Sequence, residues 1–301
     1  MNNNTDNFNY QAILNITYKS NQDAIEYILT KDEELATPIE ICNNHEEKFK
    51  IFIDLNFEDL NVQVNSESSI GKKVILNNLR LEQRYPTTQD SEAFYKYAET
   101  LLLKYLNRII FNYGTSRKDI TYSLQTKDYT GALYARFTTE FQLISSAKSI
   151  PQFQLSEYKK LCQGNNSEID EYIKNYLLIK EFSDPVLRLV SSYQLHELIG
   201  EKMTGRHIKT NPQKTHKYFE DNMGKAILEI ELRAVAIRNL VSHGQATHKD
   251  TIDALDKALG SPSGDYHKFD RNNKKHMEQV QQSADKFLLV IKHYLKDRVT
   301  A

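Results

Sequence analysis

The sequence predicts an α+β chain in which a mostly antiparallel sheet domain with one long helix precedes an all-helical bundle. In roughly the first ninety residues the apolar side chains form short runs with a period of two, which is typical of strands. Beyond about residue 155 these runs disappear and apolar residues repeat every three or four positions, as in packed helices. We therefore expect an α+β domain over residues 1–150 and a helical bundle over residues 151–301.

Strands are expected at several places in the first domain. The clearest spans residues 49–55, where Phe49, Ile51, Ile53 and Leu55 share one face. Residues 13–18 and 74–81 have the same β-branched and aromatic character, and Asn, Asp, Ser and Gly between them favour turns. Two more strands are expected over 120–124 and 132–137, joined by a hairpin turn at 128–131.

One long helix is expected between these strands. Its apolar stripe covers residues 94–110, and Gly114 is well placed to cap its C-terminus. In the second domain we expect helices over residues 167–181, 185–202, 214–243, 250–259 and 266–298. Short connections between these helices favour a bundle.

Composition excludes several classes of protein. The chain has 301 residues, 40% hydrophobic and 26% charged, with a net charge of −1, so it is neither disordered nor broadly basic. Its two cysteines, Cys42 and Cys162, provide neither a disulfide framework nor a Cys-rich zinc site. The N-terminus does not resemble a signal peptide, and Lys104 and Arg108 interrupt the longest apolar stretch. We expect a cytoplasmic protein that does not contact membranes.

Metal and nucleotide motifs are incomplete or absent in the sequence. His196 and Glu197 begin like a zinc-protease HExxH motif, but Gly200 stands where the second histidine should be. Neither a P-loop nor the glycine-rich dinucleotide motif occurs. We expect no metal and no cofactor, and we interpret His196 as an ordinary helix residue.

One motif carries chemistry, and it lies at the end of the expected helix over 214–243. Arg238, Asn239 and His243 form an Arg-Asn-x-x-x-His pattern directly before Gly244. His243 can exchange a proton near neutral pH, and Arg238 presents a planar, permanently charged fork suited to a phosphate. Asn239 lies four residues before His243, on the same helical face, and is expected to orient the imidazole. The alternative is structural: a cation that favours the helix C-terminus, and a histidine next to the cap.

This pattern, within the stretch AIRNLVSHG, resembles that of the HEPN domains (higher eukaryote and prokaryote nucleotide-binding). The resemblance covers roughly residues 155–300 and does not extend to the sheet domain. It implies an all-helical, metal-independent ribonuclease that acts as a dimer, with both copies of the motif lining one cleft. It also implies a role as a toxin or anti-phage defence effector, with an antitoxin or a defence-system protein as a partner. RNA supplies the nucleophile, its 2′-OH, so the expected products carry 2′,3′-cyclic phosphates.

The helix that carries the motif has two apolar faces. One face, with Ile227, Ile230, Ala234, Ile237 and Val241, is expected to cover the core of the bundle. A second stripe, formed by Leu228, Leu232 and Val235, continues into Asn239 and His243. Either the helix is covered on all sides within its own bundle, or the second stripe forms a homodimer interface, which we favour.

A basic segment precedes this helix. Residues 202–217 contain no acidic residue, and their cations are Lys202, Arg206, Lys209, Lys214 and Lys217. We expect these side chains to bind the RNA backbone, and the alternative is an ordinary solvated loop.

Three functions follow from these observations. The leading hypothesis is a HEPN-type endoribonuclease whose N-terminal domain has a sensing or regulatory role, restraining or directing the enzyme. The alternative is a catalytically silent HEPN-type dimer that binds RNA, nucleotide or protein. In the third, the motif arises by chance in a helical interaction protein.

Overall fold

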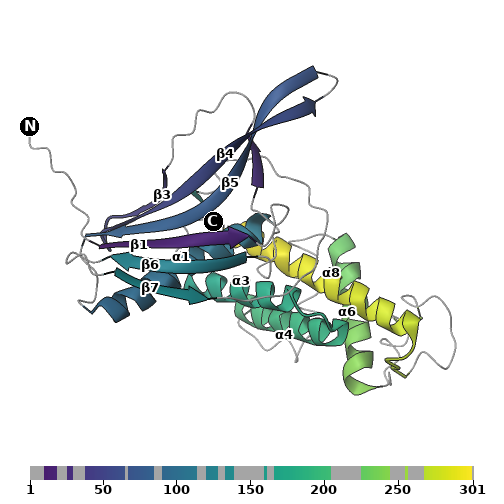
Figure 1. Ribbon diagram of the computed structural model, residues 1–301. Coiled ribbons are helices and arrows are strands. Elements are labelled where there is room, and N and C mark those ends of the chain that lie inside the picture. Colours follow the sequence, from purple (N-terminus) through teal and green to yellow (C-terminus); the bar gives the residue numbers. More distant parts are fainter. Residues whose placement is uncertain are drawn as a thin grey trace, which may run out of the picture. The chain divides into compact units, whose positions relative to one another are not determined.

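Strands dominate the N-terminal half of the computed structural model, and helices dominate the C-terminal half (Figure 1). The structure describes residues 10–18, 26–29, 38–64, 67–84, 90–113, 120–127, 133–138, 159–160, 166–204, 225–244, 255–256 and 268–299. The chain divides into two units, which we treat separately: residues 1–170 with 299–301, and residues 171–298. The α+β class expected from the sequence is confirmed.

The first unit contains an antiparallel sheet with the strand order β3-β4-β5-β1-β6-β7, and β2 also pairs with β5. Its strands are β1 (Tyr10–Tyr18), β2 (Glu26–Leu29), β3 (Ile39–Asn44), β4 (Phe49–Val64), β5 (Glu67–Gln83), β6 (Ile120–Lys127) and β7 (Leu133–Thr138). All the strands predicted from alternation are present. Strands β2 and β3 were not predicted, and β4 and β5 extend well beyond the predicted segments.

Alternating side chains place one face of this sheet in the core. Ile51, Ile53 and Leu55 of β4 are buried, as are Leu79 and Leu81 of β5, which pairs with it. The common face predicted for residues 49–55 is therefore confirmed.

Helix α1 (Ser91–Tyr113) packs against β1, β5, β6 and β7. Its N-terminus is capped by Asp90, whose Oδ1 accepts a hydrogen bond from the Glu92 amide over 3.1 Å. Most of the expected apolar stripe is buried, with Tyr97 and Leu101 half-buried, and the Phe94 ring lies 5.3 Å from the Tyr10 ring on β1. Gly114 and the turn expected at 128–131 lie outside the described residues.

A buried ionic cluster fixes α1 to the first turn of α3 (Ser167–Lys180), which belongs to the same unit. The Arg108 side chain is only 2% exposed and donates hydrogen bonds to both carboxylate oxygens of Asp170. Lys104 Nζ lies 3.1 Å from the same carboxylate. A guanidinium buried to this degree depends on its carboxylate, because its lost hydration must be replaced by hydrogen bonds.

The second unit is helical. It contains the remainder of α3, then α4 (Pro185–Thr204), α6 (Lys225–His243) and most of α8 (Lys274–Val299). Asp184 and Asn273 act as N-caps of α4 and α8, with side-chain oxygens that accept hydrogen bonds from the amides of the first turns. Asn166, in the first unit, caps α3 in the same way. The Asn273 cap shows that the prediction of a helix from residue 266 was wrong for residues 268–273, because α8 begins only after this cap.

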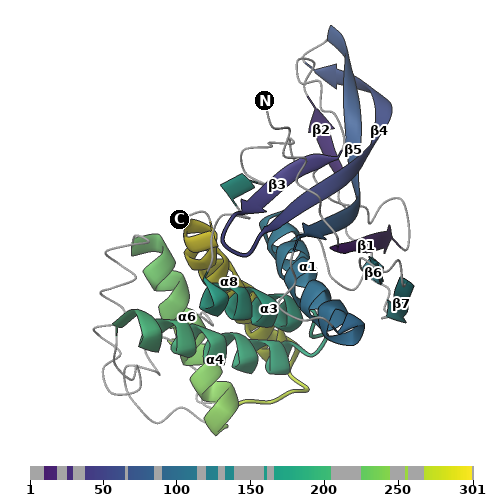
Figure 2. The same cartoon turned by 90° about the vertical axis from the view of Figure 1, so that its left-hand side faces the viewer.

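The core of this unit lies between α4, α6 and α8 (Figure 2). Leu189 of α4, Ala234 and Ile237 of α6 and Phe287 of α8 are among its buried residues. The face of α6 predicted to cover the core is therefore confirmed at Ala234 and Ile237. In the described part of the chain, no helix is long and apolar enough to cross a membrane.

Candidate functional site

The predicted motif lies in the last two turns of α6. Helix α6 ends at His243, and Gly244 follows with a φ of 71°, a left-handed conformation that glycine adopts without steric cost. The Gly244 carbonyl accepts a hydrogen bond from the Phe269 amide over 2.9 Å, and so joins the helix end to the segment before α8. The helix terminus that presents the motif is thus fixed by backbone contacts.

Arg238 is held from two sides. Its guanidinium carbon lies 4.0 Å from the centroid of the Tyr193 ring on α4, a cation–π contact. Its Nη1 donates a hydrogen bond to Asn239 Oδ1 over 3.0 Å. Its Nε is buried without a hydrogen-bond partner among the described residues. The planar fork is therefore positioned by the fold.

Tyr193 is itself held by an aromatic cluster that consists of Tyr193, His196 and Phe287. The Tyr193 ring stacks on His196 at 6.3 Å and meets the edge of Phe287 at 5.6 Å. The rings of His196 and Phe287 lie 5.4 Å apart, and these two side chains are 3% and 0% exposed. His196 thus belongs to the core of the unit. Among the described residues, no group of three His, Cys, Asp or Glu side chains is arranged to hold a metal ion.

His243 and Asn239 differ in their surroundings. His243 is exposed in the last turn of α6, whereas Asn239 is half-buried. The Asn239 carboxamide oxygen accepts its hydrogen bond from Arg238. In this structure Asn239 therefore orients the guanidinium, and its expected contact with the imidazole stays a prediction.

Half of the other predicted site residues lie outside the described part of the chain. Lys202 is exposed near the end of α4, but Arg206, Lys209, Lys214 and Lys217 lie outside the described residues. Leu228 and Leu232 lie on α6, although their side chains are not among those described. Val235 is half-buried and packs partly against the core of its own unit. The predicted dimer interface remains a prediction.

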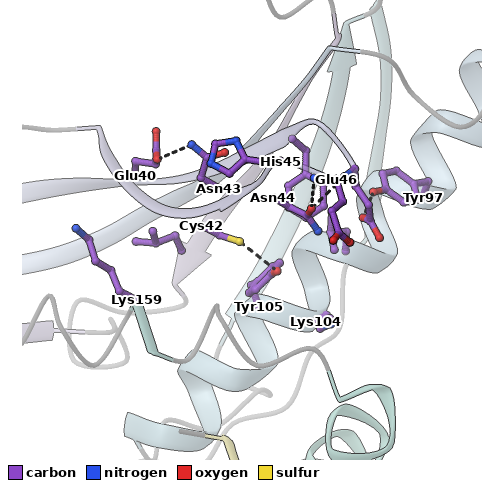
Figure 3. A pocket seen from close by; sticks show the side chains of 14 residues that line it. Glu40, Cys42, Asn43, Asn44, His45, Glu46, Tyr97, Lys104, Tyr105 and Lys159 are labelled. Carbon is purple, nitrogen blue, oxygen red and sulfur yellow. Dashed lines mark hydrogen bonds between the residues drawn. The ribbon is translucent and has the colours of Figure 1, made fainter. Parts of the chain in front are cut away.

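A second candidate site, which the sequence did not indicate, is a hollow of about 760 Å³ in the first unit (Figure 3). It lies beside the β3–β4 turn and α1. Its lining residues are Glu40, Ile41, Cys42, Asn43, Asn44, His45, Glu46, Glu47, Phe49, Tyr97, Leu101, Lys104, Tyr105 and Lys159. Cys42 and His45 both line this hollow.

Neither the Tyr97 hydroxyl nor the Cys42 thiol in this hollow is activated as a nucleophile. Burial, and then the nearby Glu47 carboxylate, raise the pKa of Tyr97 to about 12, and its hydroxyl donates a hydrogen bond to Glu47 Oε2 over 3.4 Å. Burial also raises the pKa of the Cys42 thiol, which lies 3.7 Å from the Tyr105 hydroxyl. Both groups stay protonated at neutral pH, so this arrangement fits binding better than covalent chemistry.

Comparisons of the chain with protein-family models, with curated proteins and with solved structures find no match.

Proposed function

We propose that the chain is a metal-independent endoribonuclease with a HEPN-like helical unit, in which Arg238 and His243 act on the RNA phosphodiester. The observation that carries this proposal is the positioned guanidinium of Arg238. It lies on the Tyr193 ring, is hydrogen-bonded to Asn239, and is followed about 1.4 helical turns later by an exposed imidazole. An acid–base group and a fixed cation are what cleavage by an internal 2′-OH requires.

In the proposed reaction the 2′-oxygen attacks the adjacent phosphorus while His243 takes the hydroxyl proton. The P–O5′ bond breaks, and the 5′-oxygen leaves with a proton from the protonated His243 imidazole of the second copy in the proposed dimer. The products are a 2′,3′-cyclic phosphate and a 5′-hydroxyl. Arg238 stabilises the charge that develops on the non-bridging oxygens, since its fork matches a phosphate and never loses its proton.

Helix geometry supports a dimeric site. Residues 238 and 243 are five positions apart, so they differ by about 140° around the helix and by about 7.5 Å along its axis. A second copy of α6 would supply further acid and cation groups across a two-fold axis. We therefore retain a homodimer through Leu228, Leu232 and Val235, with the basic segment over 202–217 bound to the RNA backbone. A role as a toxin or anti-phage effector in the cytoplasm, with an antitoxin or defence-system partner, belongs to the same proposal.

The test is incubation of the purified chain with labelled RNA in EDTA. The proposal predicts fragments with 2′,3′-cyclic phosphate ends, and it predicts that DNA, which lacks the 2′-OH, is spared. A parallel preparation of His243→Ala controls for contaminating nucleases. Strict dependence of cleavage on Mg²⁺ would overturn the proposed mechanism.

One observation favours a second candidate, a catalytically silent HEPN-type dimer that binds RNA, nucleotide or protein. The Asn239 carboxamide contacts Arg238, and an arginine held in this way is suited to binding a phosphate even without a general base. RNA binding that depends on Arg238, without any cleavage of the bound RNA, would select this candidate.

A further inference from the structure

The hollow in the first unit has a frame made of regular secondary structure. The β3–β4 turn forms one wall, and its conformation is fixed by Asn44, whose Oδ1 accepts hydrogen bonds from the Glu46 and Glu47 amides, each over 3.0 Å. Helix α1 supplies the opposing Tyr97, Leu101 and Tyr105. A volume near 760 Å³ lies within the range of about 300–1,000 Å³ that is usual for small-molecule sites.

Several charges in the lining are already neutralised by neighbouring residues. Glu40 lies 3.4 Å from Lys50 Nζ and accepts a hydrogen bond from the Asn43 amide group over 3.2 Å. Lys104 lies 3.1 Å from Asp170. Glu40 and Lys104 therefore do not require a charged ligand, because each already has its counter-ion in the protein.

Charges of opposite sign remain available at opposite ends of the hollow. Figure 3 shows Lys159 at one end and Glu46 beside Tyr97 at the other, with Cys42 and Tyr105 between them. In the described part of the chain neither the Glu46 carboxylate nor the Lys159 ammonium forms an ion pair. Between the ends, the lining includes the Tyr105 ring, the Cys42 thiol and the aliphatic side chains of Ile41 and Leu101 beside polar side chains of the β3–β4 turn.

We infer that this hollow binds an elongated zwitterion of about the size of a dipeptide. The cationic group of the ligand lies at Glu46 and Glu47, its anionic group lies at Lys159, and an apolar body covers Tyr105 and Leu101. A free α-amino acid fits less well, because both of its charges sit on one carbon. The first unit is thereby a ligand-binding module, which is a property distinct from RNA cleavage.

Calorimetric titration of the full chain with three probes tests this inference: leucyl-phenylalanine, its N-acetyl form and its C-terminal amide. We expect a Kd below 1 mM for the free dipeptide, and about tenfold weaker binding when either terminus is capped, since a hydrogen-bonded charge contributes about this much. Glu46→Gln should weaken the free dipeptide about tenfold but leave the N-acetyl form unchanged. Lys159→Gln should likewise spare the amide.

Lys160→Gln is the matched control, because Lys160 is an exposed neighbour that does not line the hollow. Alanyl-leucine and aminocaproate serve as two further elongated zwitterions. The inference is overturned if these two and leucyl-phenylalanine all fail to bind. It is also overturned if the capped probes bind as tightly as the free dipeptide, or if the two site variants behave like Lys160→Gln. No RNA is present in the titration, so failure here leaves the proposed ribonuclease activity untouched, and the reverse also holds.

Discussion

Replacement of Tyr193 by leucine should loosen Arg238 without touching the motif itself. The Tyr193 ring is the surface on which the guanidinium rests at 4.0 Å, and it is in turn supported by Phe287 at 5.6 Å. Leucine fills much of the volume but presents no π-face. Tyr193→Phe keeps the ring and is therefore the matched control.

The size of the effect follows from these contacts. A half-buried cation–π contact contributes about 0.5–2 kcal/mol, and an edge-to-face aromatic pair about 0.5–1.5 kcal/mol. Tyr193→Leu should therefore lower the free energy of unfolding of the helical unit by about 1–3 kcal/mol. If the positioning of Arg238 is lost in the transition state, kcat for RNA cleavage should fall about 2- to 30-fold, with KM little changed.

A double-mutant cycle separates positioning from general destabilisation. Denaturant unfolding of the wild type, Tyr193→Leu, Arg238→Met and the double variant should give a coupling energy of about 0.5–2 kcal/mol. This measurement does not depend on any activity. Additivity within about 0.3 kcal/mol, or a Tyr193→Leu enzyme with an unchanged kcat, would refute the positioning argument.

Three further predictions concern other parts of the chain. Asp170→Asn should cost about 3–5 kcal/mol in denaturant unfolding, because it leaves the buried guanidinium of Arg108 without its carboxylate, and a cost below about 1 kcal/mol would contradict the role given to this pair. Burial raises the pKa of Tyr176 to about 12, so the unfolded chain loses this proton first, and stability should fall as pH rises from about 10 towards 12, by up to about 3 kcal/mol. The stability of Tyr176→Phe should fall less over that range, and its pH dependence should match that of the wild type below about pH 9. Equal losses of stability in the two proteins would refute the assignment. Leu232→Glu should give monomers in light scattering and abolish cleavage, whereas a wild-type monomer that cuts RNA would rule out the dimeric site.

The sequence predicted those elements in which burial alternates or repeats strictly. Ile51 and Ile53 lie on the buried face of β4, and most of the α1 stripe is buried, as its period required. Strand β3 was missed because its second half is polar and its register shifts between Glu40 and Cys42, which interrupts the alternation. The start of α8 was placed too early, because the period alone does not reveal that Asn273 caps the helix.

The candidate sites were predictable only where they are local in sequence. Arg238, Asn239 and His243 lie within one helix, so the spacing alone placed them together. Tyr193 lies on another helix, and its role depends on packing that no motif encodes. The hollow combines one hairpin, one helix and Lys159, and its residues are separated by more than a hundred positions, so periodicity could not reveal it.

The central claim is that His243 is the proton-transfer group of a metal-independent ribonuclease. The most direct measurement is single-turnover cleavage of saturating RNA in EDTA by the wild type and by His243→Ala. His293→Ala is the control, because His293 is another exposed histidine of the helical unit. The account predicts a loss of about 10²-fold or more for His243→Ala and none for His293→Ala. A His243→Ala protein that cleaves RNA at the wild-type rate would contradict it.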